Sequence, residues 1–239
     1  AALAALFRLS AVTQARLDLS DEHYTGENAT RTNRTTRRFT FGLDHEFSAI
    51  TTLSANIGHS EFVETFENLP GVEHVTRGPE AALSLTRLVP NGSVSVALDT
   101  EISTVGRQTT LDFGRFIELP AGKLAFSFGA TQGAGFSLLP IGSIDYTGDL
   151  PTGAINASLS REVSISSTLS QAETTTRVDL GYQFDVNDIS SLSFDLYYAD
   201  ISLTGTGARG AGRERGRFYA SYTPAITQNW DVTGGSEDR

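Results

Sequence analysis

The chain has 239 residues, of which 28 are acidic and 18 are basic, so its formal net charge is −10. Sequence-independent nucleic-acid binding depends on Lys and Arg that neutralise phosphates, and this charge balance argues against it. The absence of cysteine excludes disulfide bonds, thiol nucleophiles and thiolate metal sites. No apolar run approaches the ~20 residues that a membrane-spanning helix requires.

The first segment introduces a pattern that recurs along the whole chain. Between residues 7 and 19 the odd positions are mainly Phe, Leu and Ala, and the even positions are mainly Ser, Gln, Arg and Asp. A period of two is that of a β-strand with one apolar and one polar face. We therefore predict one long strand over residues 7–19.

The connections between the alternating segments fall into two classes of unequal length. Short turns are predicted near Glu46–Ile50, Val89–Ser93, Glu118–Gly122, Arg161–Ser164, Asp185–Ser190 and Thr223–Asn229. Longer polar connections are predicted at Ser20–Asn33, Glu61–Arg77, Ala130–Thr152 and Thr204–Gly216, with shorter ones near Ser103–Gln108 and Gln171–Thr175. This alternation is typical of an outer-membrane barrel with periplasmic turns and extracellular loops.

A soluble β-sandwich also alternates, so segment length has to separate the two folds. Many segments reach the ~9–11 residues that cross a bilayer at a tilt, and their second face stays polar. We expect aromatic girdles at the segment ends, from Phe62, Phe116, Tyr146, Tyr198, Tyr222 and Trp230. The predicted fold is all-β: a single transmembrane up-and-down antiparallel β-barrel over residues 1–239, in the bacterial outer membrane. Its first strand is predicted to rise from the periplasm.

The number of segments gives an expectation about the complete barrel. About thirteen strands can be counted, whereas bacterial single-chain barrels have even numbers. The last segment, from Trp230, ends at Gly234–Arg239 as if entering an outer loop. We therefore expect about fourteen strands in the full barrel, with at least one closing strand beyond Arg239, and twelve if one segment is wrongly divided.

Two stretches carry a family resemblance. At Glu118–Gly122, and at Tyr222–Trp230, the chain resembles poorly characterised outer-membrane barrel proteins of alphaproteobacteria, which lie close to barrels associated with exopolysaccharide export. The motifs are turn residues and interfacial aromatics, and the likeness spans most of the chain. Such barrels usually end in an aromatic residue, whereas this chain ends in Asp238 and Arg239. The resemblance implies no catalytic residue.

Candidate catalytic and metal-binding residues are few. The four histidines, His23, His45, His59 and His74, lack the paired spacing of a metal site. His59 and Ser60 are adjacent on a predicted strand, so they point to opposite faces and do not form a nucleophile–base pair. The glycine-rich stretch 205–210 is not followed by a helix pattern, as a dinucleotide site requires. We predict no enzyme activity, no cofactor and no metal.

Charge placement on the polar parity is the most informative feature. Three arginines near the end and three near the start are predicted to face the lumen in its outer half, where the first and last strands meet. Four acidic residues are predicted to face inward on the fourth to sixth strands. The candidates are Arg16, Arg34, Arg38, Arg213, Arg215, Arg217, Glu80, Asp99, Glu101 and Asp112. A basic wall would then face an acidic wall, as in pores that select ions with rings of charge.

Several interpretations of this charge stay open. The charges can line a porin-like channel or export conduit for small polar or saccharide-like solutes, or pair with one another across a plugged interior. The upper arginines can instead contact phosphates of outer-membrane lipids and lipopolysaccharide, with divalent cations at acidic loops such as Glu61–Glu73. The alternative function is a non-conducting structural or surface-interaction barrel that acts through Glu61–Arg77 and Ala130–Thr152. A periplasmic or export partner is not identified by the sequence.

Overall fold

A computed structural model describes residues 1–25, 32–66, 73–103, 106–166, 171–187, 189–204, 212–227, 230–231 and 234–238. Every regular element in these ranges is a β-strand, and the ranges contain no α-helix long and apolar enough to cross a membrane. The strands are β1 Ala2–Arg8, β2 Thr13–Thr25, β3 Thr32–Ser48, β4 Thr51–Phe66, β5 Glu73–Val89, β6 Gly92–Ser103, β7 Gly106–Leu119, β8 Gly122–Gly133, β9 Phe136–Leu150, β10 Gly153–Ser166, β11 Gln171–Asn187, β12 Ser190–Thr204, β13 Arg213–Thr227, β14 Trp230–Asp231 and β15 Gly234–Asp238.

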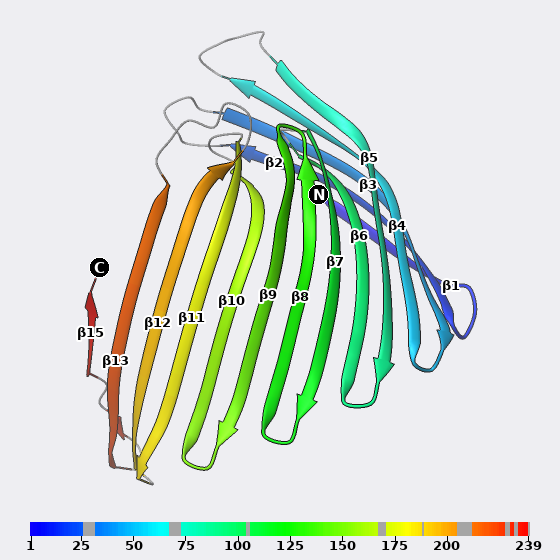
Figure 1. The fold of residues 1–239 in the computed structure, drawn as a ribbon. Coiled ribbons are helices and arrows are strands. Elements are labelled where there is room, and N and C mark those ends of the chain that lie inside the picture. Colours follow the sequence, from blue (N-terminus) through cyan, green and yellow to red (C-terminus); the bar gives the residue numbers. More distant parts are fainter. Residues whose placement is uncertain are drawn as a thin grey trace.

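The strands form one antiparallel sheet in which each strand pairs with the next one along the chain (Figure 1). The order is up-and-down from β1 to β14, and β15 pairs with β13. Strands β2 to β13 are 12 to 17 residues long, well beyond the ~5–6 of a typical globular strand. The fold is therefore an all-β, single-sheet meander, as the sequence predicts, and the sheet is strongly curved (Figure 1).

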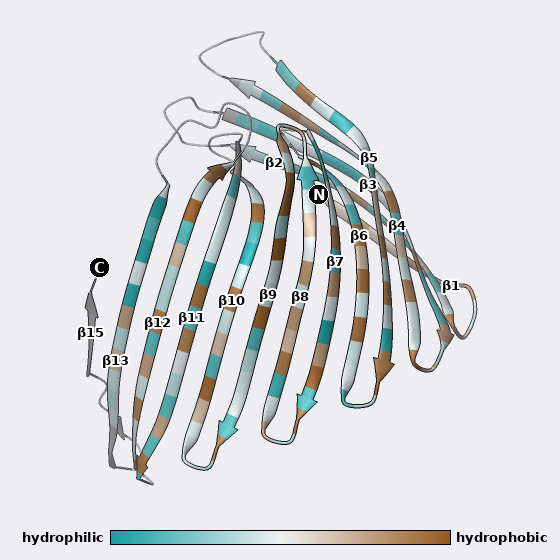
Figure 2. Ribbon diagram, viewed as in Figure 1, coloured by the Kyte–Doolittle hydropathy of each residue, from teal (hydrophilic) through white to brown (hydrophobic). Residues whose placement is uncertain are grey.

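The strand registers separate the sheet into two faces of different chemistry. One row across the sheet joins Leu43, Ala55, Leu83, Leu98 and Leu111, all of them apolar. The rows on the opposite face carry mainly Ser, Thr, Asn, Gly and charged residues. Figure 2 shows the resulting alternation of hydrophobic and hydrophilic residues along nearly every strand. The period of two in the sequence therefore reports a real division between an apolar and a polar face.

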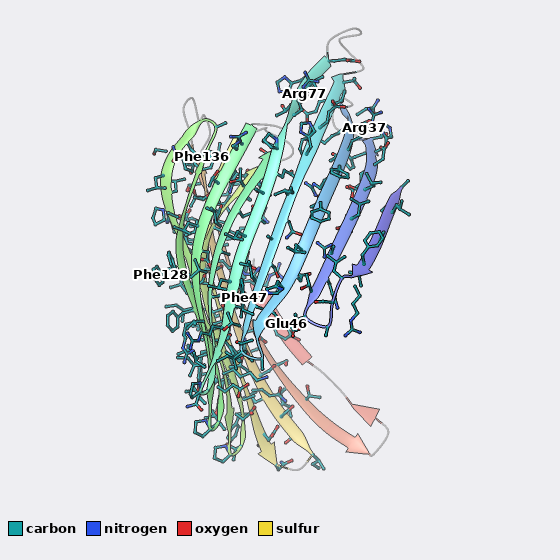
Figure 3. All side chains as sticks on the ribbon, turned by 90° about the vertical axis from the view of Figure 1, so that its right-hand side faces the viewer. Arg37, Glu46, Phe47, Arg77, Phe128 and Phe136 are labelled. Atoms are coloured by element: carbon teal, nitrogen blue, oxygen red, sulfur yellow. The ribbon has the colours of Figure 1, made fainter. Side chains whose placement is uncertain are left out.

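The apolar face has no second layer over it. Most strand residues among the exposed large hydrophobics belong to its parity, including Phe41, Leu98 and Phe194, and Phe128 is 61% exposed. Figure 3 shows Phe128 pointing away from the sheet on its convex side. Only five apolar residues among those described are buried, and three of them are alanines. A soluble sandwich would bury this face against another sheet, and the described residues contain no such sheet.

Several tight turns have backbone conformations that match their sequence. Between β5 and β6, Asn91 has φ 63° and Gly92 has φ 135°, both in the left-handed region. A Cβ atom at Gly92 would lie 2.0 Å from the carbonyl oxygen of Phe116, so only glycine fits. The predicted turns at Glu46–Ile50, Val89–Ser93 and Glu118–Gly122 are confirmed by the hairpins β3–β4, β5–β6 and β7–β8.

The prediction of one long strand over residues 7–19 is wrong, because these residues belong to two strands joined at 9–12. Ser10 begins the turn, and its hydroxyl oxygen accepts a hydrogen bond from the Val12 N–H at 3.2 Å. The register pairs Phe7 with Ala15, and both are odd-numbered, so the alternation continues across the turn and hides it. Consequently β1 runs from the end with the longer connections toward the short turns, opposite to the predicted direction.

The predicted long connection Ala130–Thr152 is also wrong. Its residues form the end of β8, a turn at 134–135, the 15-residue strand β9 and the turn at 151–152. Pro140, Gly142 and Gly148 weaken the alternation of β9, which is why the strand was not predicted. The predicted turn Arg161–Ser164 and connection Gln171–Thr175 likewise lie inside β10 and β11, where Glu162 pairs with Thr175.

The predicted aromatic girdle is only partly correct. Tyr146, Tyr198 and Tyr222 lie on the apolar parity, where an interfacial residue belongs. Phe62 and Phe116 instead share the polar face, since Phe62 pairs with Thr36 and Phe116 with Ser93. The side chain of Trp230 lies outside the described residues, as do the glycine-rich stretch 205–210 and the middle parts of the predicted connections Ser20–Asn33, Glu61–Arg77 and Thr204–Gly216.

Candidate functional site

All ten charged candidates lie on the polar face of the sheet. One row of paired residues across the sheet runs from Arg16 through Asn56 and Ala82 to Asp99. Ala97, two residues before Asp99 on the same face of β6, pairs with Asp112. The remaining candidates, Arg34, Arg38, Glu80, Glu101, Arg213, Arg215 and Arg217, have the same parity on their strands. The structure thus collects on one face the residues that alternation selected. Six of them fall into two clusters, and Arg16, Arg34, Arg213 and Asp112 lie outside both.

The first cluster consists of Arg38 on β3, Glu80 on β5, and Asp99 and Glu101 on β6. The Nε atom of Arg38 lies 3.1 Å from a carboxylate oxygen of Glu80, and it donates a hydrogen bond to the hydroxyl of Ser60 at 3.1 Å. These four charged residues line a hollow of about 200 Å³, together with Thr40, Asn56, Ile57, Gly58, Ala81, Ala82 and Thr100. We call it the Arg38 cluster; it holds three carboxylates and one guanidinium.

A second ion pair lies beside the Arg38 cluster. Arg34 on β3 donates to a carboxylate oxygen of Glu64 on β4 from Nε at 3.0 Å and from Nη2 at 2.6 Å. The side chain of Glu64 is only 7% exposed and that of Arg34 is 21% exposed. A buried carboxylate needs such a partner because burial without one is costly.

The predicted separation into a basic and an acidic wall is wrong on β3 to β6. Arg38 contacts Glu80 directly, and the acidic candidates sit on the fifth to seventh strands because the first hairpin shifts the strand count. Arg16 is the fourth residue of β2, counted from a short turn, so it lies in the half of the sheet opposite to the one predicted. Its Nε pairs with Asp18 at 2.6 Å. Arg213–Arg217 lie on β13, ten strands along the sheet from β3.

The second cluster lies on β11, β12 and β13, and we call it the Arg177 cluster. It consists of Arg177, Asp179, Tyr197, Arg215 and Arg217. Arg177 donates to both carboxylate oxygens of Asp179, from Nε at 2.5 Å and Nη2 at 2.9 Å, and its Cζ lies 4.9 Å from the centre of the Tyr197 ring. Tyr197 is paired in register with Asp179 on one side and Arg217 on the other.

Sequence analysis missed several residues of this face. Glu64 and Glu173 were placed in connections, and Glu173 lies 3.8 Å from Nη2 of Arg213. Arg177 and Tyr197 were not among the predicted site residues. A signal was available: Arg177 and Asp179 are two residues apart with opposite charge, so they share a face of one strand.

The four histidines are not members of either cluster. His23 and His45 contact the hydroxyls of Thr35 and Thr13 at 3.1 and 2.9 Å, and His74 contacts Thr76 at 3.3 Å. His59 pairs in register with Phe39 on the apolar parity, whereas Ser60 is fully buried on the polar side. Among the described residues, no group of three His, Cys, Asp or Glu side chains is arranged to hold a metal ion.

Comparison with known proteins gives structural likenesses alone. No protein-family model matches the chain, and no curated protein matches it. A solved structure with a similar arrangement is that of the CymD monoaromatic hydrocarbon channel. The two are 10% identical, with a TM-score of 0.41 over 99% of this chain and 77% of that chain.

Proposed function

We propose that the chain forms the wall of a β-barrel in the bacterial outer membrane, and that small polar or saccharide-like solutes pass along its polar face. The observation that supports this most is the uncovered apolar face, which extends over nearly all strands of the sheet. Soluble monomers rarely expose apolar patches above a few hundred Å², so this face requires an apolar environment. Hydrocarbon supplies that environment for one face while water contacts the other.

Charged residues on the apolar parity mark the limits of the hydrocarbon band. On β5, Arg77 and Arg87 have this parity, and the four residues of the same parity between them are uncharged: Pro79, Ala81, Leu83 and Leu85. Ten residues of strand span about 33 Å. At a tilt of about 40° this corresponds to a height of about 25 Å, the height of the apolar band in outer-membrane barrels. The spacing of the two arginines therefore fits one bilayer crossing.

The polar face supplies the lining that a solute pathway needs. It carries the Arg38 cluster and the Arg177 cluster on separate strands, so both signs of charge are presented to water. Charged groups on the walls of a water-filled passage select and orient solutes. Contact of this face with lipid would be unfavourable, because each charged side chain costs free energy in hydrocarbon.

Conductance of the full-length protein in a planar bilayer tests the proposal. We expect ion currents, and Arg38→Glu together with Arg217→Glu should shift the reversal potential in a KCl gradient toward cation selectivity. The matched control is Arg77→Glu on the apolar parity, which should leave selectivity unchanged. An absence of current at every voltage, from protein that folds and inserts into vesicles, would exclude the channel.

The alternative of a non-conducting barrel that interacts through its loops has less support. One of the two connections on which it relied, Ala130–Thr152, contains strand β9. Glu61 and Glu64, at the start of an acidic loop for which divalent cations are one interpretation, contact Arg37 and Arg34. Outer-membrane location, lipid partners and the likeness to alphaproteobacterial barrels stay predictions, and membrane fractionation of the natural host tests the first of them.

A further inference from the structure

A hollow on the polar face of β11 to β13 has the size of a ligand site. Its volume is about 740 Å³, within the ~300–1,000 Å³ of small-molecule sites. It is lined by Arg177, Tyr197, Glu214, Arg215, Gly216 and Arg217. Three of these six residues are arginines with side chains on the polar parity, whereas Glu214 has the opposite parity.

Arg177 is held in a fixed orientation at one side of the hollow. Asp179 accepts hydrogen bonds from its Nε and Nη2 atoms, and the ring of Tyr197 lies against its guanidinium plane. Cation–π contact and a two-point ion pair together restrict the rotation of a side chain that is otherwise very mobile. The Nη1 atom is not used by this pair, so it can donate to a bound group without loss of the orientation.

Two arginines of β13 complete the site. Arg217 pairs in register with Tyr197, and Arg215 pairs with Ala199, which in turn pairs with Arg177. Ala199 is fully buried, so a small residue lies between two long cationic side chains. Arg177 and Arg215 both line the hollow, on either side of this alanine. Three arginines face two carboxylates here, those of Asp179 and Glu214, so the site keeps a formal charge of +1 and favours an anion.

We infer that the Arg177 cluster binds the carboxylate of small acidic sugars and related sugar acids, and that it directs these solutes along the pathway in preference to neutral sugars. The inference rests on the proposed function. Guanidinium groups present paired N–H donors in the plane that a carboxylate requires, which an ammonium group does not do. Charge of one sign along a wall also raises the local concentration of the opposite solute.

Uptake of glucose and glucuronate into proteoliposomes tests the inference, because the two sugars differ by a carboxylate in place of a hydroxymethyl group. The variant is Arg177→Gln with Arg215→Gln and Arg217→Gln, and the matched control is Arg77→Gln with Arg87→Gln and Arg107→Gln on the apolar parity. We expect the ratio of glucuronate to glucose uptake to fall about threefold to tenfold in the variant. The control should keep the ratio of the unmodified protein.

The possible outcomes separate the two proposals. If glucose enters and the ratio is the same in variant and unmodified protein, the subsite is wrong and the channel stands. If neither sugar enters, the channel is wrong. Calorimetric titration of glucuronate into the detergent-solubilised protein then tests binding at the Arg177 cluster separately. Heat of binding that the triple variant lacks supports the subsite, and no heat with the unmodified protein excludes it.

Discussion

At the scale of single residues, the sheet carries ion pairs that differ in their exposure. Arg37, at the level of the longer connections on the apolar parity, lies 3.7 Å from Asp21 and 3.5 Å from Glu61, and its side chain is 63% exposed. Exposed pairs of this kind contribute little to stability. Arg34 and Glu64 are much less exposed. Glu64 depends on its partner, because a carboxylate removed from water must be compensated.

We therefore expect Arg34→Met to lower the free energy of unfolding by about 2 kcal/mol, because the Glu64 carboxylate loses a partner at 2.6 Å. Arg34→Met combined with Glu64→Gln should recover most of that loss, since no buried charge is left alone. Arg37→Met is the exposed control. Urea unfolding in lipid vesicles measures all three, and equal losses for the single and double variants would contradict a charge-based explanation.

The turn at Gly92 gives a second residue-scale prediction. Gly92→Ala should destabilise the protein by about 1–3 kcal/mol, since alanine at φ 135° is strained and its Cβ would meet the Phe116 carbonyl oxygen. Gly216→Ala is the matched control: a Cβ there has nothing within 4 Å. The same urea unfolding measures both. A control loss as large as that of Gly92→Ala would show that the turn conformation is not the cause.

At the scale of strands, the sequence predicts which residues share a face of a strand better than it predicts the residues at which the strand begins and ends. The faces of β3 to β7 follow directly from alternation, and Leu83 and Leu98 pair as expected of one apolar row. The β1–β2 hairpin was missed because parity is the same before and after its turn. Strand β9 was missed for the opposite reason, since Pro140 interrupts its pattern. Local alternation thus shows which face of a strand a residue lies on. Where a strand begins and ends is decided by its hydrogen bonds with neighbouring strands.

Insertion of a short epitope tests the corrected β8–β9 hairpin. An epitope between Ala134 and Gly135 lies in a turn, where Gly135 has φ 92°, and it should leave folding intact. The same epitope between Ser143 and Ile144 interrupts pairs with both Ser127 and Ser160, and it should prevent folding. Heat-dependent mobility on gels measures the folded fraction. If both insertions were tolerated, residues 130–152 would form the long connection that the sequence predicts, and not strand β9.

The candidate site could be predicted only in part, for a physical reason. Parity placed Arg38, Glu80 and Asp99 on one face, and the structure confirms that they share it. The contact between Arg38 and Glu80 depends on register between strands that are not neighbours in the sheet. A single sequence does not specify that register, because each turn shifts it independently. For the same reason the Arg177 cluster could not be predicted, because its residues come together only through the registers of β11, β12 and β13.

At the scale of the whole molecule, the central question is what covers the convex face. A lysine at the centre of the apolar band would meet hydrocarbon, whereas a lysine one position along the strand would meet water on the polar face. Leu83 lies six residues from Arg77 and four from Arg87, and it is 47% exposed with no second layer over it. Its neighbour Ser84 has the opposite parity and pairs with Ser54 and Ala97.

Leu83→Lys should therefore reduce stability in lipid vesicles by about 2–4 kcal/mol, the cost of a cation near the middle of a bilayer. Ser84→Lys should change it much less, because water hydrates the ammonium group on that face. Urea unfolding in vesicles of two acyl-chain lengths measures both variants, and the cost of Leu83→Lys should be larger in the thicker bilayer. If Ser84→Lys were the more destabilising variant, the convex face would be in water, and both the membrane barrel and the solute pathway would be wrong.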